Sequence, residues 1–228
     1  MQGKGSGTES LDVEARIALD FLDSLGVENP TVLDIGANIG KYSEAILAIN
    51  PNARIFAFEP SKAARRNLEE RFVGDSRVTV VPLALSNIES TETLWSDKAG
   101  SGLASLTKRK LDHFGIDFNV SEKVTVSALD SWAEVSQIVP NLIKMDVEGH
   151  ELNVLKGGLR TVSLSQVIQF EFGGCNIDTR TFFQDFWYFF TEAGFEIYRV
   201  SKTKPIRILR YSEEEEYFST TNYLAVKK

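Results

Sequence analysis

The sequence predicts an α/β fold in which strands and helices alternate around a mainly parallel sheet. Apolar segments of strand length alternate with amphipathic segments of helix length, which is the pattern of consecutive βα units. A glycine-rich turn follows the first apolar segment and stands directly before a helix. With 228 residues, 43% of them hydrophobic and 25% charged, the chain is long enough to bury one sizeable core. We therefore expect one domain over residues 11–228, preceded by a flexible tail at 1–10.

The predicted elements follow one another along the chain. We expect strands at 31–35, 54–58, 78–81, 142–145, 166–170, 195–200 and 223–226, which makes six or seven strands. Helices are expected at 11–25, 39–49, 62–72, 150–156 and 181–193. Apolar residues four apart predict the buried face of the first helix: Val13, Ile17, Phe21 and Leu25. Aromatic residues four apart predict the buried face of the last helix: Phe182, Phe186 and Phe190.

The regular alternation is interrupted between residues 87 and 126. This segment is polar and rich in loop residues, and we expect short antiparallel strands over the carboxyl edge of the sheet. Such an insertion is a candidate lid over a substrate. Ser101, Ser105 and Thr107 either hydrogen-bond a polyhydroxylated acceptor or belong to a plain polar loop. A second irregular segment, the acidic run 213–216, is interpreted as a solvated loop without a function.

Composition excludes several classes of partner. The net charge is −7 and no lysine- or arginine-rich stripe is present, which argues against a nucleic-acid partner. No apolar run reaches the roughly 18 residues that a membrane span needs, and the first ten residues lack the apolar centre of a secretory signal. The single cysteine, Cys175, fits a reducing compartment. We expect a soluble cytoplasmic protein that acts on a small molecule, and we leave a homo-oligomer open.

The turn after the first strand, Asp34 to Gly40, predicts a binding site for a nucleotide-like ligand. Gly36 and Gly40 allow a tight turn and a close approach of ligand to backbone, and the following helix offers unpaired N–H groups. Asn38 stands where the dinucleotide fingerprint has its second glycine, which counts against NAD and FAD. Asp34 suits a cationic ligand group such as the ammonium or sulfonium of S-adenosylmethionine.

A second carboxylate ends the next predicted strand. Glu59 follows Gly40 by 19 residues, and a carboxylate there can accept two hydrogen bonds from a ribose diol. Taken singly, Asp34 could cap the turn and Glu59 could be a solvated strand end. The spacing of both residues between apolar strands favours the cofactor interpretation.

Several segments resemble the FkbM family of S-adenosylmethionine-dependent methyltransferases. They are DIGANIGKYS (34–43), FAFEPSKAARRNL (56–68), VPLALSN (81–87), SGLASL (101–106) and LIKMDVEGHELNVLKGG (142–158). Together they extend from about Asp34 to Phe172, and IKMDVEGHE is the most specific of them. From Trp187 to Lys228 no family motif is found, so acceptor recognition there stays open.

The resemblance implies a Rossmann-like class I methyltransferase fold, with helices on both faces of a seven-stranded sheet and an antiparallel last strand. It also implies O-methylation of a hydroxyl on a sugar, glycan or secondary metabolite. The residues that it predicts to bind the cofactor are Asp34, Gly36, Asn38, Gly40, Glu59, Pro60, Ala84 and Asp146. The alternatives are a nicotinamide-dependent oxidoreductase and a non-catalytic adenosine-ligand-binding protein of the same fold.

The segment Lys144 to His150 follows the fourth predicted strand and supplies the candidate catalytic residues Lys144, Asp146, Glu148 and His150. Methyl transfer is an in-line displacement, and an alcohol acceptor also needs a base for its proton. Lys144 and Asp146 are two positions apart, so their side chains point to the same side of a strand. Because their charges are opposite, we expect an ion pair. His150 titrates near neutrality and is a natural base, but it could equally cap the following helix.

A metal ion is the other way to activate the acceptor. Asp146, Glu148 and Glu171 could gather Mg²⁺, because hard divalent ions favour carboxylates. The same residues could instead form a structural network of salt bridges. Both interpretations are open at this stage.

Overall fold

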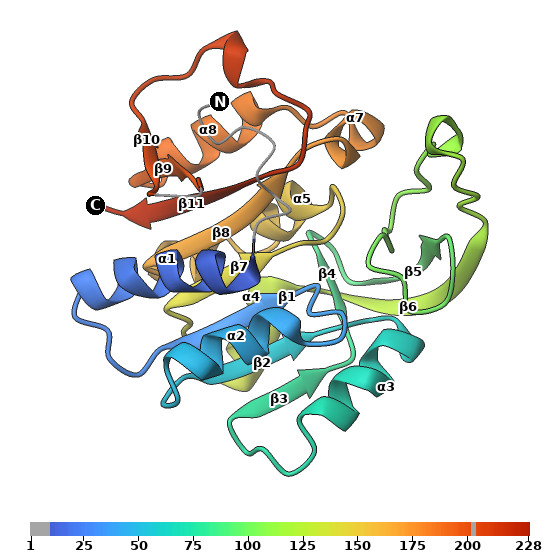
Figure 1. Cartoon of the computed structure of the whole chain (residues 1–228), viewed down its shortest axis with the longest axis horizontal. Coiled ribbons are helices and arrows are strands. Elements are labelled where there is room, and N and C mark those ends of the chain that lie inside the picture. Colours follow the sequence, from blue (N-terminus) through green and yellow to red (C-terminus); the bar gives the residue numbers. More distant parts are fainter. Residues whose placement is uncertain (1–9, 202–203) are drawn as a thin grey trace.

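The structure is a computed structural model that describes residues 10–201 and 204–228 (Figure 1). The expected tail at 1–10 therefore lies outside the described residues, apart from Ser10. The main sheet has eight strands in the order β10-β9-β11-β8-β7-β1-β2-β3. Their bounds are β1 Thr31–Ile35, β2 Arg54–Phe58, β3 Val78–Val81, β7 Leu142–Met145, β8 Val167–Phe172, β9 Phe195–Arg199, β10 Ile206–Ile208 and β11 Thr221–Lys227.

Strand direction confirms the mainly parallel sheet. The pairs β3–β2, β2–β1, β1–β7 and β7–β8 are all parallel, whereas β11 runs antiparallel between β8 and β9. Only the strand count differs, because the short β10 adds an eighth strand at the edge. The strand β10 consists of Ile206, an arginine and Ile208, so it contains no apolar run from which a strand could be predicted.

Helices cover both faces of the sheet. One core contains buried residues of α1 (Leu11–Ser24), α2 (Lys41–Ile49) and α3 (Lys62–Arg71), and Figure 1 shows α1 and α2 in front of the sheet. The other core contains residues of α4 (Leu129–Ser136), α5 (Glu151–Lys156), α6 (Leu159–Leu164) and α8 (Phe183–Glu192). A short helix, α7 (Cys175–Thr179), follows β8. None of the helices in the described ranges is long and apolar enough to cross a membrane.

The buried faces of two helices differ from the predicted ones. In α1 the buried residues are Glu14, Ala15, Ala18, Leu19 and Leu22, whereas Leu25 is 44% exposed. A repeat of four drifts around a helix of 3.6 residues per turn, and the two alanines allow α1 to pack closely. In α8 the buried aromatic residues are Phe183, Phe186 and Phe190. Phe182 is 50% exposed because it precedes the helix as its N-cap residue.

The insertion forms a second, three-stranded sheet in the order β4-β6-β5 (Figure 1). Strands β5 (Ser90–Ser96) and β6 (Val120–Ala128) pair antiparallel, which confirms the predicted strands there. The prediction missed β4 (Ala84–Ser86), which pairs parallel with β6. A small core of its own contains Ala84, Leu94, Val124 and Val126. Between β5 and β6 the chain contains one 3-10 turn, η1 (Asp112–Phe114).

The acidic run 213–216 lies between two strands as predicted, with Glu213 and Glu214 exposed, but its other two residues have structural partners, which the interpretation as a solvated loop did not include. It forms the 3-10 turn η2 (Glu213–Glu215), in which Glu215 pairs with the buried Arg199. Glu216 accepts hydrogen bonds from the backbone N–H groups of Phe183 (2.8 Å) and Gln184 (2.9 Å). These are two of the N–H groups that a helix start leaves unpaired, so Glu216 caps α8.

Candidate active site

The turn after β1 brings the backbone against the end of β7. Gly36 has a φ of +79°, and a Cβ atom there would lie 1.9 Å from the carbonyl oxygen of Asp146. Gly40 has a φ of +82° and is the N-cap residue of α2, and a Cβ there would lie 2.6 Å from Leu68 and Phe72 of the α3 region. Gly36 therefore permits the close contact beside the site, and Gly40 permits helix packing behind it.

A cleft opens beside this turn, between the carboxyl ends of the strands and the insertion. Its volume is about 730 Å³ including the open mouth. The residues that line it are Ile35, Gly36, Asn38, Glu59, Pro60, Leu83, Ala84, Leu85, Leu94, Ser101, Gly102, Ala104, Ser105, Leu106, Asp146, Val147 and His150. Apolar walls thus surround a small number of polar groups.

Glu59 is the buried carboxylate of this cleft. Its Oε2 atom accepts a hydrogen bond from the N–H of Asn38 (2.8 Å), and its Oε1 atom accepts one from the N–H of Ser61 (2.8 Å). Burial raises the pKa of Glu59 to about 7, and the two backbone donors act in the opposite direction. Each oxygen keeps a further lone pair, so the carboxylate can still accept hydrogen bonds from a ligand diol.

Asn38 links the turn to the insertion. It has a φ of +50°, a backbone conformation that asparagine tolerates better than most residues. Its side-chain Nδ2 donates to the carbonyl oxygen of Ser101 (3.3 Å), and its Oδ1 accepts from the N–H of Ile39 (2.9 Å). The hydrogen bond from Asn38 to Ser101 thus connects the wall of the cleft that the insertion forms to the wall that the main sheet forms.

Asp34 and Lys144 lie behind the cleft rather than in its wall. Asp34 is fully buried, and its carboxylate accepts from the hydroxyl of Ser43 (2.7 Å) and lies 3.3 Å from the ammonium of Lys144. Lys144 also lies 3.6 Å from Asp146, which is the predicted ion pair. Burial by itself lowers the pKa of Lys144, but Asp34 and Asp146 together raise it above its usual range. The ammonium is therefore held in its charged form.

The structure thus sorts the predicted cofactor-binding residues into two groups. Those that line the cleft are Gly36, Asn38, Glu59, Pro60, Ala84 and Asp146. Asp34 and Gly40 support the cleft from behind. A direct contact between the Asp34 carboxylate and a ligand in this cleft does not fit its full burial and its two partners. The Asp34 carboxylate lies instead beside the Lys144 ammonium, which also lies near Asp146.

His150 lines the cleft, but both of its ring nitrogens have protein partners. The side-chain NH₂ group of Asn153 lies 3.3 Å from Nδ1, and in the tautomer in which Nδ1 accepts from this donor the ring proton is on Nε2. Nε2 lies 2.8 Å from the hydroxyl of Ser86, which donates onward to Asn87. Burial lowers the pKa of His150 to about 4. In this arrangement the ring is neutral and has no free lone pair in the ring plane for a substrate proton.

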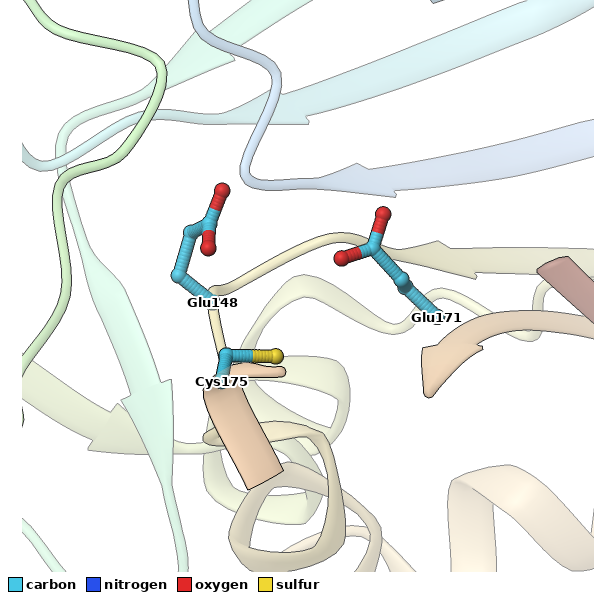
Figure 2. Close-up of side chains that lie close together, drawn as sticks. All are labelled: Glu148, Glu171 and Cys175. Atoms are coloured by element: carbon cyan, nitrogen blue, oxygen red, sulfur yellow. The ribbon is translucent and has the colours of Figure 1, made fainter. Parts of the chain in front are cut away.

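Glu148 and Glu171 lie close together beside Cys175 (Figure 2). The two carboxyl groups point the same way, one from the turn after β7 and one from the end of β8. Each of the three side chains offers one atom that could bind a metal ion, and these three atoms lie within 4.8 Å of one another. Burial, followed by the nearby Asp146, raises the pKa of Glu148 to about 8 and that of Glu171 well above its usual range. Burial likewise raises the pKa of the Cys175 thiol, so without a bound ion the thiol stays protonated at neutral pH.

The three carboxylates predicted to bind Mg²⁺ do not form one set among the described residues. Asp146 faces Lys144, and the carboxylate of Glu148 pairs with the guanidinium of Arg109. The group that the structure does gather contains a thiol in place of Asp146, whereas Mg²⁺ prefers oxygen ligands. The donor set therefore does not fit Mg²⁺.

Arg109 is the site residue that the sequence analysis missed. Its side chain is 9% exposed and pairs with both Glu148 and Asp178 (3.5 Å to the latter). The hydroxyl of Ser105 also donates to the carbonyl oxygen of Glu148 (2.9 Å), so two contacts connect the insertion to this turn. The only signal in the sequence was the short basic cluster 108–110, which looks like an ordinary solvated patch.

Comparison with known proteins identifies the family of the chain. Residues 34–197 match the family model of the methyltransferase FkbM domain, which covers more than half of the chain. The chain belongs to the FkbM methyltransferase family. The matched range of the FkbM domain begins at Asp34 and includes the whole wall of the cleft. The resemblance inferred from the sequence motifs is thereby confirmed.

Two curated relatives of this FkbM domain have known names. It is 26% identical over 182 residues to the 2-O-methyltransferase NoeI of Sinorhizobium fredii, a match that covers 75% of this chain and 73% of NoeI. It is 30% identical over 131 residues to the hexuronic acid methyltransferase AglP of Haloferax volcanii, a match that covers 57% of this chain and 50% of AglP.

A solved structure supports the fold of the FkbM domain. The methyltransferase FkbM from Methylobacillus flagellatus superposes with a TM-score of 0.54 at 17% identity. The match covers 87% of this chain but 44% of that one, so this chain spans less than half of the larger protein. The Rossmann-like class I methyltransferase fold is thereby confirmed.

Proposed function

We propose that this protein is an S-adenosylmethionine-dependent O-methyltransferase that acts on a hydroxyl group of a sugar, a glycan or a secondary metabolite. The observation that carries the proposal is the position of Glu59. This buried carboxylate lines the cleft at the end of β2, next to the Gly36 turn, and keeps lone pairs for a ribose diol. Membership of the FkbM family supports the reaction class.

The residues of the cleft fit S-adenosylmethionine. Gly36 lets the turn lie directly against Asp146 at the cleft, Glu59 suits the ribose, and the apolar wall with Ala84 suits the adenine. The cofactor supplies an activated methyl group on a sulfonium, and its positive charge suits the carboxylate of Asp146 at the cleft. A pyrophosphate would instead meet the side chain of Asn38 and a carboxylate-lined wall, which disfavours a nicotinamide cofactor.

The names of the two curated relatives support the proposed acceptor class. NoeI is named as a 2-O-methyltransferase and AglP as a methyltransferase of hexuronic acid, so one of the two names specifies a sugar acid. Ser101 lines the cleft from the insertion, and its hydroxyl accepts from the N–H of Leu103 (3.0 Å), which leaves the hydroxyl proton for a hydrogen bond to such an acceptor. These features favour a carbohydrate over an apolar hydroxyl compound.

Asp146 is the residue that we propose takes the acceptor proton. Its side chain is 41% exposed at the cleft and lies 3.6 Å from the Lys144 ammonium, which keeps its charge balanced. His150 is less suited, because both ring nitrogens are engaged and its pKa is lowered to about 4 by burial. The bound cofactor would supply the methyl group to the acceptor oxygen and leave as the neutral thioether, and a carboxylate oxygen of Asp146 would accept the hydroxyl proton.

The first test compares four ligands in a thermal-shift assay: S-adenosylmethionine, S-adenosylhomocysteine, NAD and NADP. At about 100 times its dissociation constant a ligand adds roughly 2.7 kcal/mol of stability, which raises the melting temperature by several degrees. We expect a shift with the two adenosyl-sulfur ligands alone. A shift with a nicotinamide ligand alone would refute the proposal.

The second test measures methyl transfer. The protein is incubated with methyl-labelled S-adenosylmethionine and a panel of neutral sugars, uronic acids, amino sugars and phenolic compounds, and the products are analysed by mass spectrometry. Label on a carbohydrate hydroxyl is the expected result. Cofactor binding without transfer to any hydroxylated acceptor would favour the non-catalytic alternative, and label on nitrogen would refute O-methylation.

A further inference from the structure

A row of polar side chains crosses one face of the main sheet beneath the cleft. In the strand register Asp34 pairs with Lys144, and Lys144 pairs with Gln169, so the three side chains point to the same face of β1, β7 and β8. Two residues earlier, the same face carries the apolar side chains of Val32 and Leu142. A polar row on such a face needs internal partners, because buried polar groups without hydrogen bonds are costly.

Glu14 of α1 supplies the partner at one end of this row. It is 2% exposed, and its Oε2 atom accepts a hydrogen bond from Nε2 of Gln169 (2.9 Å). Its Oε1 atom accepts another from the side-chain amide of Asn222 on β11 (2.8 Å). The other end of the Gln169 amide, Oε1, accepts from the hydroxyl of Tyr42 on α2 (2.8 Å). The amide of Gln169 is therefore held in one orientation by partners on both sides.

Tyr42 connects these hydrogen bonds to the cleft. The ammonium of Lys144 lies 5.3 Å from the centre of the Tyr42 ring, within the range of a cation–π interaction. Lys144 in turn lies 3.6 Å from Asp146, which lines the cleft. A continuous series of contacts thus leads from Glu14 to Asp146, although the two residues lie on different elements and more than a hundred positions apart in the sequence.

We propose that Glu14 is a positioning residue for the cleft, which holds Lys144 and thereby the Asp146 carboxylate in place through Gln169 and Tyr42. The role of Asp146 toward cofactor and acceptor rests on the proposed function. Glu14 and Asn222 both lie outside residues 34–197, so the match to the FkbM domain assigns neither of them. Burial raises the pKa of Glu14 to about 7, and Lys144 acts in the opposite direction, as expected for a carboxylate close to that ammonium.

The test replaces Glu14 by glutamine, which has the same shape without the charge. The matched control is Asp20→Asn, the same carboxylate-to-amide change on an exposed position of α1. The dissociation constant of S-adenosylhomocysteine is measured by calorimetry at a temperature where both variants are folded. We expect about a tenfold weaker affinity for Glu14→Gln, and no change for the control.

A double-mutant cycle with Tyr42→Phe separates positioning from a general loss of stability. Because both changes interrupt the same series of contacts, the double variant should bind about as weakly as the weaker single variant. Two outcomes would overturn the proposal. One is a double variant whose fold-loss of affinity equals the product of the fold-losses of the two single variants, and the other is an unchanged affinity in Glu14→Gln.

Hydrogen exchange gives a readout that does not depend on any ligand. Exchange measured by mass spectrometry should be faster in Glu14→Gln than in Asp20→Asn for the peptide that spans residues 142–150. Faster exchange confined to the peptide of α1 would mean that Glu14 only anchors its own helix, and would refute the positioning role. If the wild-type protein bound no adenosyl ligand, the proposed function would fail, and this exchange measurement would still decide the role of Glu14.

Discussion

The ammonium of Lys144 lies 3.3 Å from Oδ1 of Asp34, and the two residues are direct register partners on neighbouring parallel strands. Asp34 is fully buried and Lys144 is 5% exposed. A buried ion pair contributes little net stability compared with an apolar pair, but the loss of one partner leaves an uncompensated charge. The pair therefore makes each residue dependent on the other.

Replacing Lys144 by methionine should destabilise the protein strongly. We expect the free energy of unfolding, measured by urea denaturation, to fall by about 3–5 kcal/mol, because Asp34 would stay buried without a cation. The double variant Asp34→Asn/Lys144→Met removes both charges and should regain part of this loss. A single variant that lost less than about 1 kcal/mol would contradict the inferred dependence.

Alanine at position 36 should abolish cofactor binding. The new Cβ would lie 1.9 Å from the Asp146 carbonyl oxygen, so the turn or the end of β7 must move. Gly26→Ala is the matched control, because Gly26 has a similar φ of +77° and nothing within 4 Å of a Cβ. The free energy of unfolding of the control should fall by about 1–2 kcal/mol, which is the cost of a left-handed backbone for a residue with a Cβ, and its cofactor affinity should be unchanged. Equal behaviour of the two variants in calorimetry would refute the role of Gly36.

The affinity for S-adenosylhomocysteine should depend on the ionisation of Glu59. Burial raises the pKa of Glu59 to about 7, so the carboxylate form, which accepts hydrogen bonds best, is lost as the pH falls through 7. We expect weaker binding at pH 6 than at pH 8 in the wild-type protein, and a flatter profile in Glu59→Gln. Glu28→Gln, at an exposed position that does not line the cleft, should keep the wild-type profile.

Replacing Arg109 by methionine should loosen the insertion. Glu148 would lose its cationic partner, and we expect a loss of about 1–3 kcal/mol, together with faster proteolysis within residues 97–111. Burial already raises the pKa of Glu148 to about 8, and removal of Arg109 would raise it further, so the loss should be larger at pH 9 than at pH 6. Lys110→Met, at a neighbouring exposed position, is the control. A loss that is equal in the two variants would show that the ion pair is unimportant.

Glutamine at position 151 should stabilise the protein above neutral pH. Glu151 is fully buried, its Oε1 accepts from the N–H groups of Val147 and Gly149, and its Oε2 has no hydrogen-bond partner among the described residues. Burial raises its pKa to about 7.

Because the folded-state pKa of Glu151 is above the usual value, its stabilising contribution is present below about pH 4.5 and is lost as the pH rises through 7. The melting temperature of Glu151→Gln should therefore equal that of the wild type near pH 5 and exceed it at pH 8. The corresponding gain in the free energy of unfolding at pH 8 is up to about 3 kcal/mol. A lower melting temperature at pH 8 would contradict this account.

Much of the fold was predictable because strands buried on both faces are short apolar runs. The predicted strands at 31–35, 54–58 and 142–145 coincide with β1, β2 and β7. Short elements with few apolar residues, such as β4 and β10, carry no such signal. They form because a neighbouring strand offers a free edge, which is a property of the assembled sheet.

The candidate site was predictable where it depends on the local turn. Gly36, Asn38 and Glu59 all line the cleft, because a turn at the carboxyl edge of a parallel sheet determines where a ligand can lie. The role of His150 was not predictable, since its partners Ser86 and Asn153 decide the state of the ring. No sequence pattern reports which nitrogen has a free lone pair.

The sequence by itself determined the order of the elements, the edge of the sheet that carries the site and the family to which the chain belongs. These properties follow from local periodicity and from motifs within short segments. Only the tertiary structure decided which charges meet: Arg109 with Glu148, Asp34 with Lys144, and Glu14 with Gln169. Such pairs join segments far apart in the chain, and a buried charge is stable only where the packed fold brings its partner to it.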